Sequence, residues 1–115
     1  MALTTRELPR GEWTQFFNDF SRDLDSPQVT VEVAGQEIGA QVEAERLRLT
    51  GITYDHKDDI LVVGLDAKGG LPEELEHIVY QPQKIYLASD EGGLTVFDVE
   101  DAEGHQTLVR VEPAA

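Results

Sequence analysis

The 115-residue chain has 23 acidic and 9 basic residues, a formal net charge of −14, and 40% apolar residues. This length supports one hydrophobic core, so we expect a single domain over residues 1–115. The carboxylate excess disfavours nucleic acids and anionic membranes as partners, because both are bound through Lys and Arg. The absence of cysteine excludes disulfides and thiol chemistry. No apolar stretch is as long as a signal core or a membrane span, so a cytoplasmic location is expected.

An aromatic stripe predicts an amphipathic helix over about residues 10–24. Five large apolar residues recur with the spacing of one helical face: Trp13, Phe16, Phe17, Phe20 and Leu24. Pro9 suits the first turn of a helix, and Pro27 pushes the residue before it out of the helical conformation. Because such a helix cannot bury its aromatic face alone, we expect the β-rich region that follows to cover it.

The region of residues 28–111 alternates with the two-residue period of β-strands. Its first strand carries three valines on one face: Val29, Val31 and Val33. Turn signals recur at residues 35–37, 55–58, 91–93 and 102–104. The apolar segment 60–65 predicts a central strand, and two short strands, 77–80 and 84–88, are interrupted at Pro82. Residues 66–76 are expected to form the longest irregular segment. The pattern predicts about seven short antiparallel strands that follow one another as a meander.

The strand after the first turn changes the phase of its alternation twice. Its even-numbered apolar residues, including Val42, are expected to face inward, but the pattern moves to odd numbers at Leu47 and Leu49. It returns to even numbers beyond Gly51. A phase change without a turn predicts a β-bulge or a bend, and bends curl a sheet. We therefore predict an α+β fold, an amphipathic helix packed on a strongly curved antiparallel meander or a small, partly open barrel.

Several segments together resemble a family of small uncharacterised bacterial proteins. They are Leu8-Pro9-Arg10-Gly11-Glu12-Trp13, Phe16-Phe17, His77-Ile78 ahead of Pro82, and Gly104 followed by Thr107-Leu108-Val109-Arg110. The resemblance covers nearly the whole chain and implies a fold and a bacterial source, without an activity. In topology alone the chain is also similar to Sm-like and SH3-like barrels. The basic, base-stacking positions that RNA binding requires are missing here.

His77 is the residue with the best chemical setting. It follows Glu76 and opens a strand that holds Tyr80. A histidine beside carboxylates at a loop edge can exchange protons or bind a ligand, whereas a structural histidine bonded to the backbone is the alternative. We therefore name His77, Tyr80 and Glu76 as the candidate ligand-binding residues.

The other motifs predict turns. His56 lies in an acidic segment whose spacing does not match a calcium loop, so a solvated turn is expected. His105 follows Gly104 and is expected to be exposed. The pairs Gly69-Gly70 and Gly92-Gly93 lack the context of a phosphate loop. No catalytic set, metal site or cofactor is predicted.

Three functions remain open. The first is a non-enzymatic interaction or regulatory domain that binds a protein partner or forms a homodimer through a strand edge. The second is a small-molecule or metal-binding site near residues 66–80. The third is an acidic inhibitor of a basic partner, which requires carboxylates on one face, whereas here they are spread over most strands and turns. We favour the first.

Overall fold

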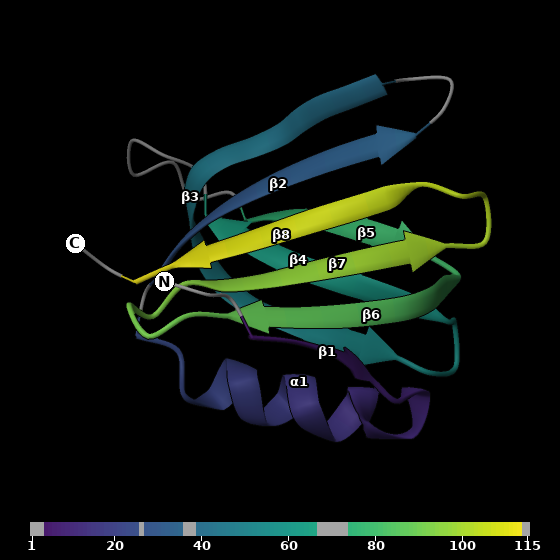
Figure 1. Cartoon of the computed structure of the whole chain (residues 1–115), viewed down its shortest axis with the longest axis horizontal. Coiled ribbons are helices and arrows are strands. Elements are labelled where there is room, and N and C mark those ends of the chain that lie inside the picture. Colours follow the sequence, from purple (N-terminus) through teal and green to yellow (C-terminus); the bar gives the residue numbers. More distant parts are fainter. Residues whose placement is uncertain (1–3, 26, 36–38, 67–73, 114–115) are drawn as a thin grey trace.

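The computed structural model describes residues 4–25, 27–35, 39–66 and 74–113, which form one α-helix, one 3₁₀ helix and eight strands (Figure 1). The elements in chain order are β1 (Thr4–Leu8), η1 (Arg10–Glu12), α1 (Trp13–Arg22), β2 (Gln28–Gly35), β3 (Gly39–Asp55), β4 (Ile60–Asp66), β5 (Glu74–Tyr80), β6 (Pro82–Ser89), β7 (Thr95–Asp101) and β8 (Gln106–Glu112). The predicted α+β class is confirmed. The eighth strand is β1, which precedes the helix and lies outside the β-rich region predicted over residues 28–111.

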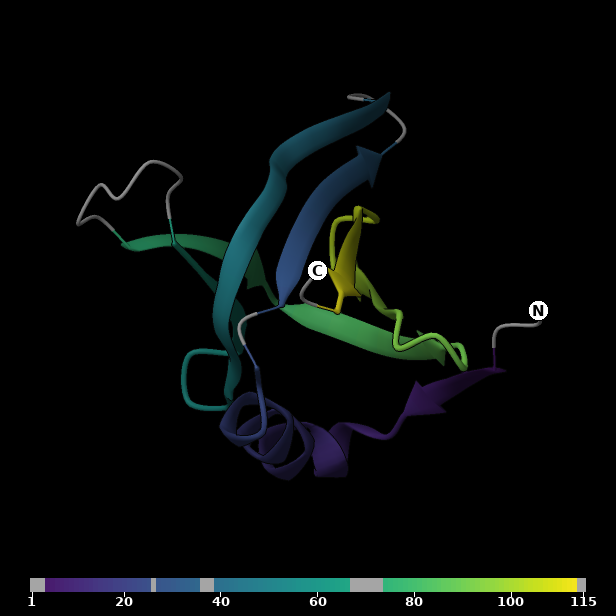
Figure 2. The ribbon, with the colours of Figure 1, turned by 90° about the vertical axis from the view of Figure 1, so that its left-hand side faces the viewer.

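All eight strands pair antiparallel in one sheet, in the order β1-β6-β7-β8-β2-β3-β4-β5. Strands β2 to β5 form one meander and β6 to β8 form another, and the last strand, β8, returns to pair with β2. Strands β5 and β6 are joined through Gln81 alone but lie in different halves of the sheet and do not pair. The sheet is therefore strongly curved without closing, as Figure 2 shows, and it leaves a seam between β5 and β6.

The bends of β3 lie where the alternation changes phase. Register shifts interrupt the β2–β3 ladder between Val29 and Glu32, and Arg46 on the opposite strand has φ = 52°. A second shift lies between Leu49 and Gly51 in the β3–β4 ladder. These bulges turn β3 from β2 toward β4, so the prediction of a bent strand is confirmed.

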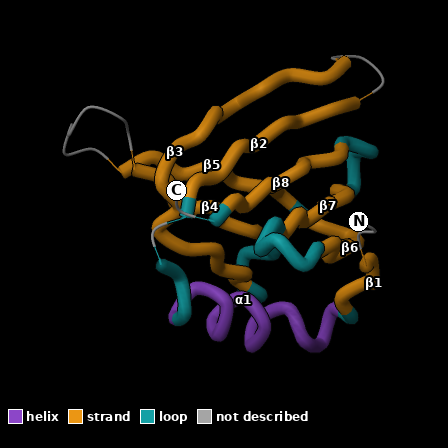
Figure 3. The backbone as a smooth tube through the Cα atoms, turned by 60° about the vertical axis from the view of Figure 1, so that its left-hand side comes forward, coloured by secondary structure: helices purple, strands orange, loops and turns teal. Residues whose placement is uncertain are grey.

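Helix α1 covers the core from outside the sheet (Figure 3). Trp13 and Phe17 are buried, and Phe17 packs on Phe97 of β7 with the ring centroids 5.2 Å apart. The β2–β3 pairing ends at Gln28 and Arg48, so Ile52 lies beyond the last β2 partner. The hydroxyl of Ser21 donates to the carbonyl of Ile52 (2.7 Å) and accepts from its N–H (2.8 Å). A helix side chain thus satisfies the backbone where the neighbouring strand has ended.

Two expectations need correction. The helical segment ends at Arg22, two residues before the predicted end, and its first turn is the 3₁₀ helix η1. Val42 does not face inward: the register shift between Val31 and Glu32 pairs it with Glu32, which points away from the core, and it is 56% exposed. The predicted turn at Gln36-Glu37 and residues 67–73 of the predicted irregular segment 66–76 lie outside the described residues. The two ends of that segment are not irregular, because Asp66 ends β4 and Glu74 begins β5.

In the described ranges of the chain, no helix has both the length and the apolar character needed to cross a membrane.

Candidate functional site

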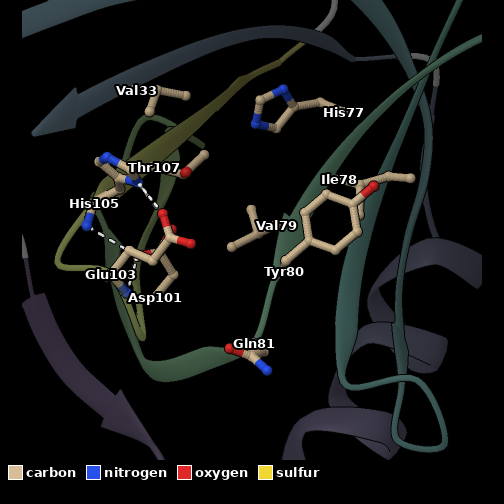
Figure 4. Close-up of a pocket in the computed structure, with 10 residues that line it drawn as sticks. All are labelled: Val33, His77, Ile78, Val79, Tyr80, Gln81, Asp101, Glu103, His105 and Thr107. Atoms are coloured by element: carbon tan, nitrogen blue, oxygen red, sulfur yellow. Dashed lines mark hydrogen bonds and ion pairs between the residues drawn. The ribbon is translucent and has the colours of Figure 1, made fainter. Parts of the chain in front are cut away.

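A cavity of about 270 Å³ lies at one end of the curved sheet, between β5 and the facing strands β2, β7 and β8 (Figure 4). We call it the barrel mouth. The side chains that line it include Val33, His77, Asp101, Glu103, His105 and Thr107. They come from strands far apart in sequence, which the curvature of the sheet brings together.

The barrel mouth is where the apolar core gives way to polar groups. On the inner face of β8, Val111 and Val109 are followed by Thr107 and then by His105, just outside the strand. Strand β7 changes in the same way, from Phe97 and Val99 to Asp101, and β5 changes from Val79 to His77. Alternation places all these residues on the concave side, so the polar residues end the interior of the fold.

His105 lies between two carboxylates. Its Nδ1 is 3.5 Å from Oδ2 of Asp101 and 3.9 Å from Oε2 of Glu103. Asp101 is 15% exposed, and its other oxygen accepts the backbone N–H groups of Glu103 and His105, both at 2.9 Å. Gly104 completes this turn with φ = 85°, a conformation that favours glycine. The turn therefore fixes Asp101 and leaves its second oxygen directed at the imidazole.

Gly35 makes room for the ring of His105. A Cβ atom at position 35 would lie 2.4 Å from Cδ2 of the imidazole, closer than van der Waals contact allows. The missing side chain at the end of β2 thus lets the imidazole pack directly against the backbone. The ring stays 32% exposed and remains accessible from the barrel mouth.

The backbone of Gln81, the residue between β5 and β6, links the two sides of the seam by hydrogen bonds, and we call this residue the pivot. This residue has φ = 51°; its N–H donates to the carbonyl of Asp59 (2.9 Å), and its carbonyl accepts from the N–H of Ala102 (3.1 Å). The pivot joins the two halves of the sheet and fixes β5 opposite the turn that carries Asp101.

Arg10 supports this pivot from the N-terminal segment. Its guanidinium donates to the carbonyl of Pro82 (2.8 Å) and to the hydroxyl of Tyr54 (3.2 Å), and it lies 4.5 Å from the centre of the Trp13 ring. Tyr54 in turn donates to Asp59 (2.7 Å). Burial and this contact with the Asp59 carboxylate raise the pKa of Tyr54, so the hydroxyl stays protonated as a donor.

The three predicted ligand residues do not share one face of β5. Figure 4 shows His77 and Val79 on the side facing His105, whereas Tyr80 lies on the other side. Tyr80 is 66% exposed at the rim, and Glu76 borders the opposite, outer face of the sheet. Strand alternation separates them: residues 77 and 79 point inward, and residues 76 and 80 point outward.

His105 was not predicted as a site residue, and the expectation that it is exposed is wrong: it is half-buried at the barrel mouth. The signal was present in the alternation, since residues 105, 107, 109 and 111 share one face of the strand. His56, by contrast, is exposed in the turn between β3 and β4, as predicted.

The barrel mouth offers hydrogen-bond acceptors and imidazoles. Within the described ranges, no three His, Asp or Glu side chains are grouped closely enough to hold a metal ion. Two carboxylates and two imidazoles can instead bind a polar group that donates several hydrogen bonds.

These features define a small α+β protein with one helix packed on a curved, open antiparallel sheet and a polar cavity at one end. The chain belongs to a family of unknown function (DUF5335), whose model matches residues 4–115. It is 34% identical over 112 residues to an uncharacterised protein of Aquifex aeolicus (strain VF5), covering 97% of this chain and 96% of the relative. The predicted resemblance to an uncharacterised bacterial family is thus confirmed. No solved structure is significantly similar to the chain.

Proposed function

We propose that this protein is a non-enzymatic binding domain whose barrel mouth binds a small molecule carrying a protonated amine or guanidinium group. The observation that supports the proposal is the position of the polar residues. His77, Asp101 and His105 occupy inward positions of the fold, next to an open cavity rather than in tight packing.

The charge at the barrel mouth favours a cation. Asp101 and Glu103 are its carboxylates, and neither forms an ion pair with a described Lys or Arg. The surrounding chain adds a strong negative field, with a net charge of −14. A cation in a concave site of this kind gains both charge-assisted hydrogen bonds and attraction from the whole protein.

The size of the cavity limits the ligand. A volume of about 270 Å³ lies at the lower end of ordinary ligand sites. It suits a compact amine, or the end of a longer one, with Val33 and Val79 providing apolar contact for a short alkyl chain.

The test uses agmatine, which carries a guanidinium and an amine on a four-carbon chain, and glutarate as a compact dianion. We expect agmatine, and not glutarate, to raise the melting temperature and to shift the imidazole NMR signals of His77 and His105. Glu103→Gln removes one carboxylate that is 80% exposed, and we expect it to weaken agmatine binding by about two- to fivefold, because an exposed ion pair contributes at most about 1 kcal/mol.

His56→Ala is the matched control, because His56 is an exposed histidine outside the barrel mouth. It should leave the affinity for agmatine unchanged. Equal responses to agmatine and glutarate, or agmatine shifts confined to residues away from His77 and His105, would refute a cation site here.

A further inference from the structure

The outer face of the sheet, opposite the barrel mouth, carries a carboxylate with an unsatisfied buried oxygen. In the described part of the chain, Oδ1 of Asp98 is the one buried side-chain oxygen or nitrogen without a hydrogen-bond partner. Phe97 and Val99 on either side of it point into the core, so Asp98 points outward from β7. Burial and the nearby Glu100 raise its pKa, because both disfavour the charged form.

Half-buried apolar residues surround this carboxylate. Tyr86 on β6 and Leu108 on β8 are its direct cross-strand neighbours, and Val96 lies two residues away on the same face of β7. Aromatic residues are typical of the centre of a protein interface, where an acidic residue is uncommon and needs a donor from the partner. A buried polar atom without a partner costs free energy, which a donor from outside the chain can recover.

The same face carries a donor that is not in use. Arg110 on β8 is exposed, and its side chain makes no hydrogen bond or ion pair with any described residue. It stands opposite Val96 in the ladder, one outward position along from the Asp98–Leu108 pair. The Asp98 carboxylate, which is an acceptor, and the Arg110 guanidinium, which is a donor, therefore lie on neighbouring strands of one face and do not pair with each other.

This arrangement is self-complementary. The relevant two-fold axis lies in the plane of the interface, passes midway between Asp98 and Arg110 and is perpendicular to the line that joins them. Rotation about this axis places each Asp98 opposite the Arg110 of a second copy. We propose that this outer face is the interface of a symmetric homodimer in which the Arg110 guanidinium of each copy donates to the Asp98 carboxylate of the other. The proposal is independent of ligand binding at the barrel mouth.

The dimensions predict a weak dimer. Five strands, β1-β6-β7-β8-β2, spaced about 4.8 Å apart and about seven residues long give an outer face of roughly 550 Å² per copy, which is an upper limit because this face is the convex side of the curved sheet. The total of at most roughly 1,100 Å² is below the standard size of specific interfaces, so a dissociation constant between about 10 μM and 1 mM is expected. Because two chains of net charge −14 repel each other, the dimer should also strengthen as salt is raised from low ionic strength.

The test is sedimentation velocity from about 10 μM to 1 mM protein, the range in which the dimer is expected to form. Arg110→Glu and Asp98→Arg each replace an attraction by a repulsion, and each should weaken the dimer by at least about 30-fold. The double variant, Asp98→Arg with Arg110→Glu, restores opposite charges across the interface and should recover most of the dimer.

Lys57→Glu is the matched control, since it makes the same charge change on the exposed turn between β3 and β4. It should leave the dimer unchanged. Arg110→Glu alters an exposed side chain and should stay folded, so its loss of dimer can be interpreted even where Asp98→Arg is unstable.

A chain that stays monomeric at about 1 mM refutes the proposal, since the expected dissociation constant does not exceed that concentration. In that case a basic partner protein remains as the occupant of this face. A dimer that both single variants leave intact, or that the folded double variant fails to recover, refutes the proposed contact.

Discussion

Replacing Arg10 by alanine should destabilise the protein far more than the exposure of this side chain suggests. Arg10 is 49% exposed, yet it contacts the N-terminal segment, the β3–β4 turn and the start of β6. Arg10→Ala removes its contacts with Pro82, Tyr54, Asp59 and Trp13 together. The carbonyl of Pro82, which is itself buried, would then lose a charged donor.

The magnitude follows from the separate contacts. The charged hydrogen bond to the Pro82 carbonyl is half-exposed and contributes about 1–1.5 kcal/mol. The stacking on Trp13 adds about 0.5–1 kcal/mol, and the ion pair with Asp59, at 3.4 Å and well solvated, adds at most about 0.5 kcal/mol. We expect a loss of about 1.5–3 kcal/mol in the free energy of unfolding, or about 6–12 °C in melting temperature for a chain of this length.

Urea unfolding monitored by Trp13 fluorescence measures this loss, because Trp13 is the one tryptophan and is buried. Arg10→Lys keeps the charge without the planar fork and should lose about half as much. Arg22→Ala is the control: Arg22 pairs with Asp19 on the surface of α1 and is 69% exposed, so its removal should cost less than about 0.5 kcal/mol. A loss from Arg10→Ala no larger than that from Arg22→Ala would refute the role given to Arg10.

Two further predictions concern single positions. Asp98→Asn should stabilise the dilute monomer at pH 7 by about 0.5–1 kcal/mol, since it removes a charge that burial disfavours. The pKa of Asp98 is raised in the folded state, so the protonated carboxyl group favours folding. This contribution to stability is fully present below pH 3.8, the ordinary pKa of Asp, and is lost as the pH rises through the folded-state pKa. The advantage of Asn should therefore vanish near pH 3 in thermal melts, and a gain independent of pH would contradict this cause. Gly35→Ala should displace the His105 ring, reduce stability by about 1 kcal/mol and weaken agmatine binding. Gly11→Ala, where a Cβ meets no atom within 4 Å, should do neither; retained agmatine binding in Gly35→Ala would show that the ring position is unimportant.

The helix and the bent strand could be predicted because each depends on a local pattern. The aromatic residues follow the period of an α-helix throughout, and their large apolar area predicts that this face is buried. The burial of Trp13 and Phe17 confirms the prediction. The bends of β3 leave a trace in the phase of the alternation, since a bulge adds one residue and exchanges the two faces. The failure at Val42 has the same origin: the register shift between Val31 and Glu32 turns Val42 to the outer face, although the alternation in the sequence changes phase only after this point.

The barrel mouth could be predicted only in part, because it is assembled by pairing between distant segments. His77 was identified from its own neighbours in sequence, but Asp101 and His105, which line the same cavity, lie on the other side of the seam. Only the return of β8 to β2 and the pivot at Gln81 bring these segments together. Nothing local to residue 105 indicates that Gly35 leaves room for its ring.

The composition of the inner face is the strongest physical argument for a binding site. Apolar side chains on that face would extend the core and bury more area, so polar residues there are a cost to stability unless they have another role. Asp101 has a structural role, because it holds the turn through two backbone N–H groups. His105 is not among the residues that hold this turn by side-chain hydrogen bonds, and it projects toward the cavity. If the cavity binds nothing, replacing His105 by an apolar residue should stabilise the protein without loss; if it binds a cation, the same change should raise stability and abolish binding.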